Sequence, residues 1–161
     1  MKLSTQDGRL LRRAIRVSER AVENGNQPFG ALLADSAGNV LLEAENSAVT
    51  GKDPTCHAET NLVKLAIREL SPEEIVSATL YTSCEPCAMC SGAMYWGGIN
   101  RMVYAMGEAD LLGLTGDHPA NPTMTGVGCR TILSSGQRDI EVLGPFLVEE
   151  AMEIHRTYWV D

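Results

Sequence analysis

The sequence predicts an α/β protein, a three-layer α/β/α sandwich with a mixed sheet of about five strands. Segments with the period of strands alternate along the chain with segments of helical period, which is the order that packs helices against a partly parallel sheet. The 161 residues suffice for one sizeable core, and 44% of them are hydrophobic. We therefore expect one domain spanning residues 1–161.

The first half of the chain contains two amphipathic helices around two short strands. Ser4 or Thr5 can cap the first helix, and Ser71, Pro72 and Glu74 match the cap, first and third positions of a short one. The expected elements are a helix at 5–23, two strands within 31–46 around a Ser-Ala-Gly-Asn turn, a loop at 47–55, a helix at 57–69 and a short helix from 72.

The second half continues this alternation and includes one long irregular stretch. Residues 107–128 are rich in Gly, Pro, Asn and Thr, which predicts a long functional loop with a little helix in it. The expected elements are a strand at 78–83, a helix at 86–96, a strand at 101–106, a strand at 139–144 and a helix at 146–159.

Charge and hydropathy limit the possible partners. There are 13 Lys and Arg against 21 Asp and Glu, a formal net charge of −8, which argues against nucleic acid as the main partner. No apolar run is long enough to span a membrane, and the N-terminal residues lack the features of a signal peptide. We expect a cytoplasmic protein with no membrane partner.

The cysteines and one histidine suggest a metal site. Five cysteines are present, an odd number, and four of them fall between Cys56 and Cys90. Such clustering in a cytosolic chain indicates metal binding or catalysis rather than a disulfide framework. A Cys-x-x-Cys pair at a helix start puts Cys87 and Cys90 on one face, and the helix N-terminus favours their thiolates.

His57 is the third ligand that the pattern indicates, which predicts one zinc ion per chain. A structural site needs a fourth protein ligand, whereas a catalytic site leaves that position to water. Glu59 follows His57 by two residues, so its carboxylate can accept the proton of a water whose pKa zinc lowers to about 7.

The full pattern, "CHAE", 26 intervening residues and "PCAMC", resembles the zinc-dependent cytidine deaminase-like superfamily. The stretches "PFGALLA", "DPTCHAE", "LYTSCEPCAMCSGAMYWGGI" and a C-terminal "YW" resemble the bacterial guanine deaminase branch, with yeast-type cytosine deaminases close behind. The resemblance implies a hydrolytic deaminase of a free nucleobase or related amino-heterocycle, such as guanine, cytosine or an aminotriazine. It also implies frequent dimers, so we expect a homodimer.

The same resemblance implies substrate contacts. Asn46 would hydrogen-bond the base, unless it is only a turn residue. Phe29 would line the pocket, unless it is plain core. The backbone near Ala58 would face the ring edge.

The C-terminal tail is implied to close the site. Tyr158 and Trp159 would lie beyond the last buried turn of their helix and fold back as a lid that stacks on the base, unless they only anchor the chain end. Asp161 would accept hydrogen bonds from the ring.

Other interpretations remain open. Cys87 and Cys90 could form a redox pair, or Cys56 or Cys84 could complete a structural zinc site. A tRNA-specific adenosine deaminase, a nucleoside or nucleotide deaminase, and a non-catalytic zinc-binding interaction module are the alternative functions. Intact Glu59 argues against a non-catalytic module, and the acidic C-terminal helix argues against tRNA.

Overall fold

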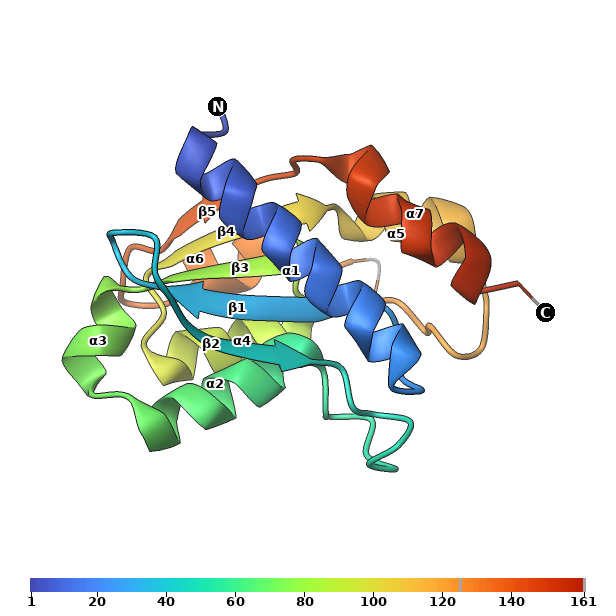
Figure 1. The fold of residues 1–161 in the computed structure, drawn as a ribbon, viewed down its shortest axis with the longest axis horizontal. Coiled ribbons are helices and arrows are strands. Elements are labelled where there is room, and N and C mark those ends of the chain that lie inside the picture. Colours follow the sequence, from blue (N-terminus) through green and yellow to red (C-terminus); the bar gives the residue numbers. More distant parts are fainter. Residues whose placement is uncertain (125, 161) are drawn as a thin grey trace.

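One five-stranded sheet, in the order β2-β1-β3-β4-β5, forms the centre of the computed structural model, which describes residues 1–124 and 126–160 (Figure 1). The strands are β1 Gly30–Ala34, β2 Val40–Glu45, β3 Thr79–Cys84, β4 Arg101–Met106 and β5 Glu141–Leu143. Strand β1 pairs antiparallel with β2 and β3, whereas β3, β4 and β5 are parallel. The prediction of a mixed sheet is confirmed.

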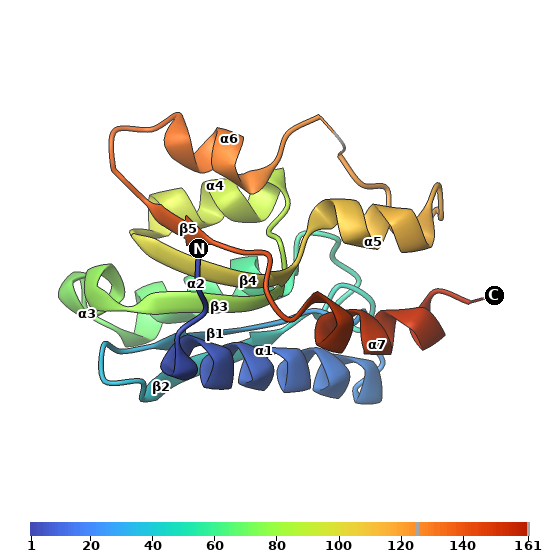
Figure 2. The same cartoon turned by 90° about the horizontal axis from the view of Figure 1, so that it is seen from above.

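Helices cover both faces of this sheet. They are α1 Thr5–Glu23, α2 Ala58–Glu69, α3 Pro72–Ser77, α4 Ala88–Gly97, α5 Glu108–Thr115, α6 Cys129–Ser134 and α7 Val148–Tyr158. Helices α1 and α7 pack on one face, and α2, α4 and α6 on the other (Figure 2). The three-layer α/β/α sandwich is therefore confirmed.

Two hydrophobic clusters lie on opposite faces of the sheet. Leu32 belongs to the cluster beneath α1, and its neighbour Leu33 belongs to the cluster beneath α2 and α4, because successive side chains of a strand alternate between faces. Burying each such leucine fully stabilises the fold by about 1.5–3 kcal/mol. Gly30 lets α1 approach closely, since a Cβ there would lie 2.4 Å from the backbone N of Ser18.

Most element boundaries agree with the sequence analysis. Helix α1 has the expected bounds, and the Ser4 side chain accepts a hydrogen bond from the Asp7 N–H. The capping box of Ser71 and Glu74 is present at α3. Helix α4 begins at Ala88, two residues later than predicted, because Cys87 keeps an extended backbone and forms its N-cap.

The stretch after β4 largely agrees with its prediction. Within residues 107–128, α5 is the little helix that the sequence analysis expected, and the described residues after it are irregular. Helix α6 was not predicted at all. Both helices are short and begin after a glycine N-cap, Gly107 or Gly128, so the sequence carries little helical periodicity and no Ser, Thr, Asp or Asn cap.

Four strand ends converge at one edge of the sheet. Cys84 at the end of β3 lies opposite Met106 at the end of β4, and Gly30 at the start of β1 lies opposite Glu45 at the end of β2. Helices α4 and α5 follow β3 and β4 at this edge, which is where α/β proteins place their ligands. Across the described residues, every helix is too short or too polar to cross a membrane.

Candidate active site

Three side chains meet between the starts of α2 and α4. His57 is the N-cap of α2, Cys87 is the N-cap of α4, and Cys90 lies in the first turn of α4. The Nδ1 atom of His57 lies 3.5 Å from the Cys87 Sγ and 3.6 Å from the Cys90 Sγ. Zn–N and Zn–S bonds of about 2.1 and 2.3 Å at tetrahedral angles require an N to S distance of about 3.6 Å. The donor set therefore fits zinc.

The site contains three protein ligands rather than four. The ligand atoms of His57, Cys87 and Cys90 all lie within 4.8 Å of one another, and no further His, Cys, Asp or Glu joins this group among residues 1–124 and 126–160. Cys84 and Cys129 are buried free thiols, as expected for small core residues. The Thr60 hydroxyl lies 3.2 Å from the Cys90 sulfur and orients it. Three ligands leave one coordination position for water, which is the catalytic pattern.

Electrostatics prepare one sulfur for metal binding. The neighbouring Cys90 thiol and His57 lower the pKa of Cys87 to about 4, against the opposing effect of burial. The same contact raises the pKa of Cys90. The lowered pKa favours the thiolate of Cys87, the form in which cysteine binds a cation.

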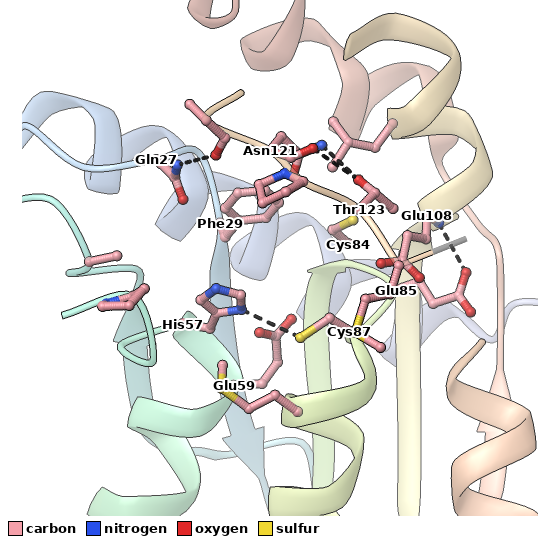
Figure 3. Close-up of a pocket in the computed structure, with 17 residues that line it drawn as sticks. Gln27, Phe29, His57, Glu59, Cys84, Glu85, Cys87, Glu108, Asn121 and Thr123 are labelled. Atoms are coloured by element: carbon pink, nitrogen blue, oxygen red, sulfur yellow. Dashed lines mark hydrogen bonds between the residues drawn. The ribbon is translucent and has the colours of Figure 1, made fainter. Parts of the chain in front are cut away.

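Glu59 lies in the first turn of α2, and only 5% of its surface is exposed. Burial raises the pKa of its carboxyl group. The Thr82 hydroxyl donates a 2.6 Å hydrogen bond to Glu59 Oε1. That bond fixes one carboxylate oxygen, and the other stays available for proton transfer beside His57 and Cys87 (Figure 3).

A cavity of about 370 Å³ opens over these residues, within the range of small-molecule sites (Figure 3). His57, Glu59 and Cys87 form part of its wall. The other lining residues are Gln27, Phe29, Ala48, Pro54, Cys84, Glu85, Met89, Glu108, Leu111, Ala120, Asn121, Pro122, Thr123 and Met124. A small molecule in this cavity would therefore lie against the Glu59 side chain.

The three residues predicted to contact a base differ in their position relative to the cavity. Phe29 lines the cavity. Asn46 is buried directly after β2; its Oδ1 accepts the Ala48 N–H, as in an Asx turn, and its Nδ2 has no partner among the described residues. Ala58 is fully buried as the first residue of α2. Neither Asn46 nor Ala58 belongs to the cavity wall, so their contact with a base stays a prediction.

The tail does not form the free lid that the sequence suggested. Tyr158 ends α7, and Trp159 is only 8% exposed because it packs in the core cluster beneath α1. Its indole N–H donates a 3.0 Å hydrogen bond to His155 Nδ1, and its ring lies 6.4 Å from that of Phe29. Trp159 thus supports the cavity wall from behind Phe29. Direct stacking of Tyr158 or Trp159 on a base stays a prediction, and Asp161 lies outside the described residues.

The two tryptophans of the chain provide a matched test of this placement. Trp159→Ala should lower the free energy of unfolding by about 3–5 kcal/mol, the usual cost of emptying a buried aromatic site. Trp96 is 86% exposed on α4, so Trp96→Ala should change the free energy of unfolding by less than about 0.5 kcal/mol. Urea denaturation of both variants measures this difference. Equal stabilities would contradict the burial of Trp159.

Sequence reasoning missed two acidic residues of the cavity wall. Glu85 precedes the Pro86–Cys87 pair, and Glu108 begins α5. Burial, reinforced by the charge of Glu85, raises the pKa of Glu108 to about 7. The signal that could have found Glu108 is its position just after β4, because the carboxyl ends of parallel strands carry the ligand-binding residues.

Glu108 should make stability depend on pH. Its raised pKa lets the folded protein keep a proton that the unfolded chain releases above the ordinary value of 4.5. The resulting stability is complete below pH 4.5 and is lost as the pH rises through about 7. Glutamine cannot ionise, so the Tm of Glu108→Gln relative to wild type should rise between pH 4.5 and pH 8. Thermal unfolding across this range checks the prediction, with Glu19→Gln at an exposed position of α1 as the control. A difference in Tm that does not depend on pH would contradict the prediction.

Residues 4–106 match the family model described as the cytidine and deoxycytidylate deaminase zinc-binding region. The chain belongs to this family. A probable cytosine deaminase of Schizosaccharomyces pombe is 40% identical over 98% of the chain and 95% of the relative. The guanine deaminase of Bacillus subtilis is 38% identical over 62% of the chain and 64% of the relative. A tRNA-specific adenosine deaminase of Aquifex aeolicus is 37% identical over 59% of the chain and 62% of the relative.

Solved structures with a similar fold confirm the α/β/α architecture. The guanine deaminase from Nitrosomonas europaea has a TM-score of 0.79 at 22% identity, over 98% of this chain and 86% of that one. Related structures with TM-scores of 0.80 and 0.75 contain 8-azaguanine and 2,6-diaminopurine, respectively. At such identities the likeness concerns the fold alone.

Proposed function

We propose that the protein is a zinc-dependent hydrolytic deaminase of a free nucleobase or a closely related amino-heterocycle. The observation that carries this proposal is the buried carboxyl group of Glu59 beside a three-ligand zinc site that opens into a cavity. The whole-chain similarity to a probable cytosine deaminase supports it and makes cytosine the first base to test.

The chemistry follows from Glu59 and the metal ligands. Zinc held by His57, Cys87 and Cys90 supplies Lewis-acid activation of a water molecule. Glu59 accepts a proton from that water, while the Thr82 hydroxyl holds its other oxygen. Glu59 then donates the proton to the ring nitrogen next to the carbon under attack, and later moves a second proton to the leaving amine. The ring exchanges its C–NH₂ group for a carbonyl, and ammonia leaves.

The cavity wall suits a flat ring without a bulky substituent. Phe29 offers an aromatic surface, and stacking on a base stabilises a complex by roughly 1–3 kcal/mol. Asn46 lies outside the cavity wall, but its buried Nδ2 is a donor without a partner among the described residues, which a base reaching it would satisfy. The residues after α5 line the other side of the cavity. We therefore expect free bases to be better substrates than nucleosides.

An ammonia-release assay tests this function. The zinc-loaded protein is incubated with cytosine, guanine, aminotriazines, the matching nucleosides and a tRNA anticodon stem-loop. The proposal requires at least one free base to be the best substrate, with Glu59→Gln as the blank. A preferred stem-loop would assign the protein to the tRNA branch. No release from any substrate, with zinc at one per chain, would favour a non-catalytic zinc-binding module.

We also propose a homodimer, a cytoplasmic location and no main nucleic-acid partner. The net charge of −8 supports the last of these. The resemblance to a family in which dimers are frequent supports the first. Sedimentation velocity of the wild-type protein tests the dimer; a protein that sediments as a monomer would end that proposal.

A further inference from the structure

The short helices α5 and α6 both begin with an N–H group that is bound by the same carboxylate. Glu85 Oε2 accepts a 3.0 Å hydrogen bond from the N–H of Glu108, the first residue of α5. Glu85 Oε1 accepts a 3.2 Å hydrogen bond from the N–H of Cys129, the first residue of α6. Glu85 therefore joins two backbone positions that lie twenty-one residues apart in the chain.

Part of the chain between these two positions, residues 107–124, lies over the cavity. Seven of the seventeen lining residues belong to residues 107–124, which we call the cover. The middle of the cover touches the opposite side of the site, where Gln27 Nε2 donates a 3.0 Å hydrogen bond to the Ala120 carbonyl. The shape of the cavity thus depends on how the cover is attached.

Neither helix start can cap itself in the usual way. The N-caps are Gly107 and Gly128, which have no side chain to accept the first N–H groups. Space is restricted at α6, because a Cβ on Gly128 would lie 3.3 Å from Glu85 Oε1, whereas one on Gly107 would lie at an ordinary contact distance of 3.7 Å from Glu85 Oε2. Glycine at position 128 lets the Glu85 carboxylate approach the start of α6, and at both helix starts this carboxylate accepts the first N–H in place of a cap side chain.

Glu85 is itself fixed to the metal-binding segment. Its backbone N–H donates a 2.8 Å hydrogen bond to the Met106 carbonyl at the end of β4, and it lies two residues before the ligand Cys87. Figure 3 shows Glu85 and Glu108 together on the side of the cavity opposite His57. The Glu85 carboxylate therefore links the cover to the segment that carries Cys87.

We propose that Glu85 is a positioning residue of the deaminase site, which fastens the starts of α5 and α6, and thereby the cover, to the segment that carries the zinc ligand Cys87. This role deepens the proposed function and rests on it. Glu85 acts through the cover on substrate binding and performs no proton transfer, which remains with Glu59. Hydrogen bonds to a charged group are among the stronger ones in proteins, so their loss should be measurable.

The kinetic test compares substitutions at and beside Glu85 for the best base of the ammonia assay. Glu85→Ala should raise KM by about tenfold or more, with a smaller change in kcat and unchanged zinc content. Glu85→Gln keeps the length and one acceptor oxygen, so its KM should lie between those of wild type and Glu85→Ala. Gly128→Ala, which crowds the same oxygen without changing Glu85, should raise KM as well. The control is Glu74→Gln, since Glu74 accepts the Ser71 N–H at the start of α3, far from the cavity.

A second readout needs no substrate, so it separates this proposal from the proposed function. In the zinc-loaded protein, Glu85→Gln should speed amide hydrogen exchange at Glu108 and Cys129, while α2 and the central strands stay protected as in wild type. An unchanged KM together with unchanged exchange would overturn the proposal. So would loss of zinc in Glu85→Gln, because Glu85 would then support the metal ligands and not the cover. An inactive wild-type protein with faster exchange in Glu85→Gln would reject the deaminase while retaining the attachment.

Discussion

Glu59→Gln should leave a folded, zinc-loaded protein that releases ammonia about 10⁴-fold more slowly than wild type. General acid–base catalysis by one group typically contributes about 10²–10⁴-fold, and here one carboxylate performs every proton transfer, so the upper end applies. Glutamine keeps the oxygen that accepts the Thr82 hydrogen bond. Burial already disfavours the ionised form of Glu59, so the neutral amide should not destabilise the fold.

Three measurements on the same samples separate chemistry from folding: kcat, zinc per chain and Tm. The control is Glu69→Gln, the same substitution at an exposed position of the same helix, which should leave all three unchanged. A Glu59→Gln variant with near-native kcat would place proton transfer on another group of the cavity, and Glu108 would then be the first to examine.

The zinc site and most of the fold were predictable because local signals agreed with the tertiary structure. The His57–Glu59 and Cys87–Cys90 spacings each sit at a helix start, and the capping residues Ser4 and Ser71 mark helices by chemistry that does not depend on distant contacts. Strand β4 has its expected bounds because five of its six residues are buried and apolar or aromatic.

The missed features all depend on residues far apart in the sequence. Helix α6 has a glycine N-cap, and its first N–H group is satisfied by Glu85, which lies well upstream. The sequence analysis expected Trp159 in a lid because nothing in the last residues shows that its ring packs near Phe29, which lies 130 positions earlier. Such contacts follow from the three-dimensional arrangement, so periodicity and capping rules cannot reveal them.

Removal of either cysteine ligand should abolish both metal binding and activity. Cys87→Ala and Cys90→Ala should each contain far less than one zinc per chain after dialysis, because a three-ligand site that loses a thiolate keeps only two donors. Cys129→Ala, which removes a buried thiol outside the ligand group, should keep its zinc. Metal analysis by mass spectrometry, together with ammonia release from the best base, checks both statements.

Thermal unfolding adds a test that does not depend on catalysis. A ligand that binds only the folded state stabilises it by RT ln(1 + [L]/Kd), so a chelator should lower the Tm of wild type and of Cys129→Ala. The same chelator should leave the Tm of Cys87→Ala and Cys90→Ala unchanged, because those variants have no zinc to lose. Full zinc content in both ligand variants, with a normal response to the chelator, would move the metal to other residues. The catalytic role of Glu59 would then fail as well, since that carboxylate can act only on a water activated beside it.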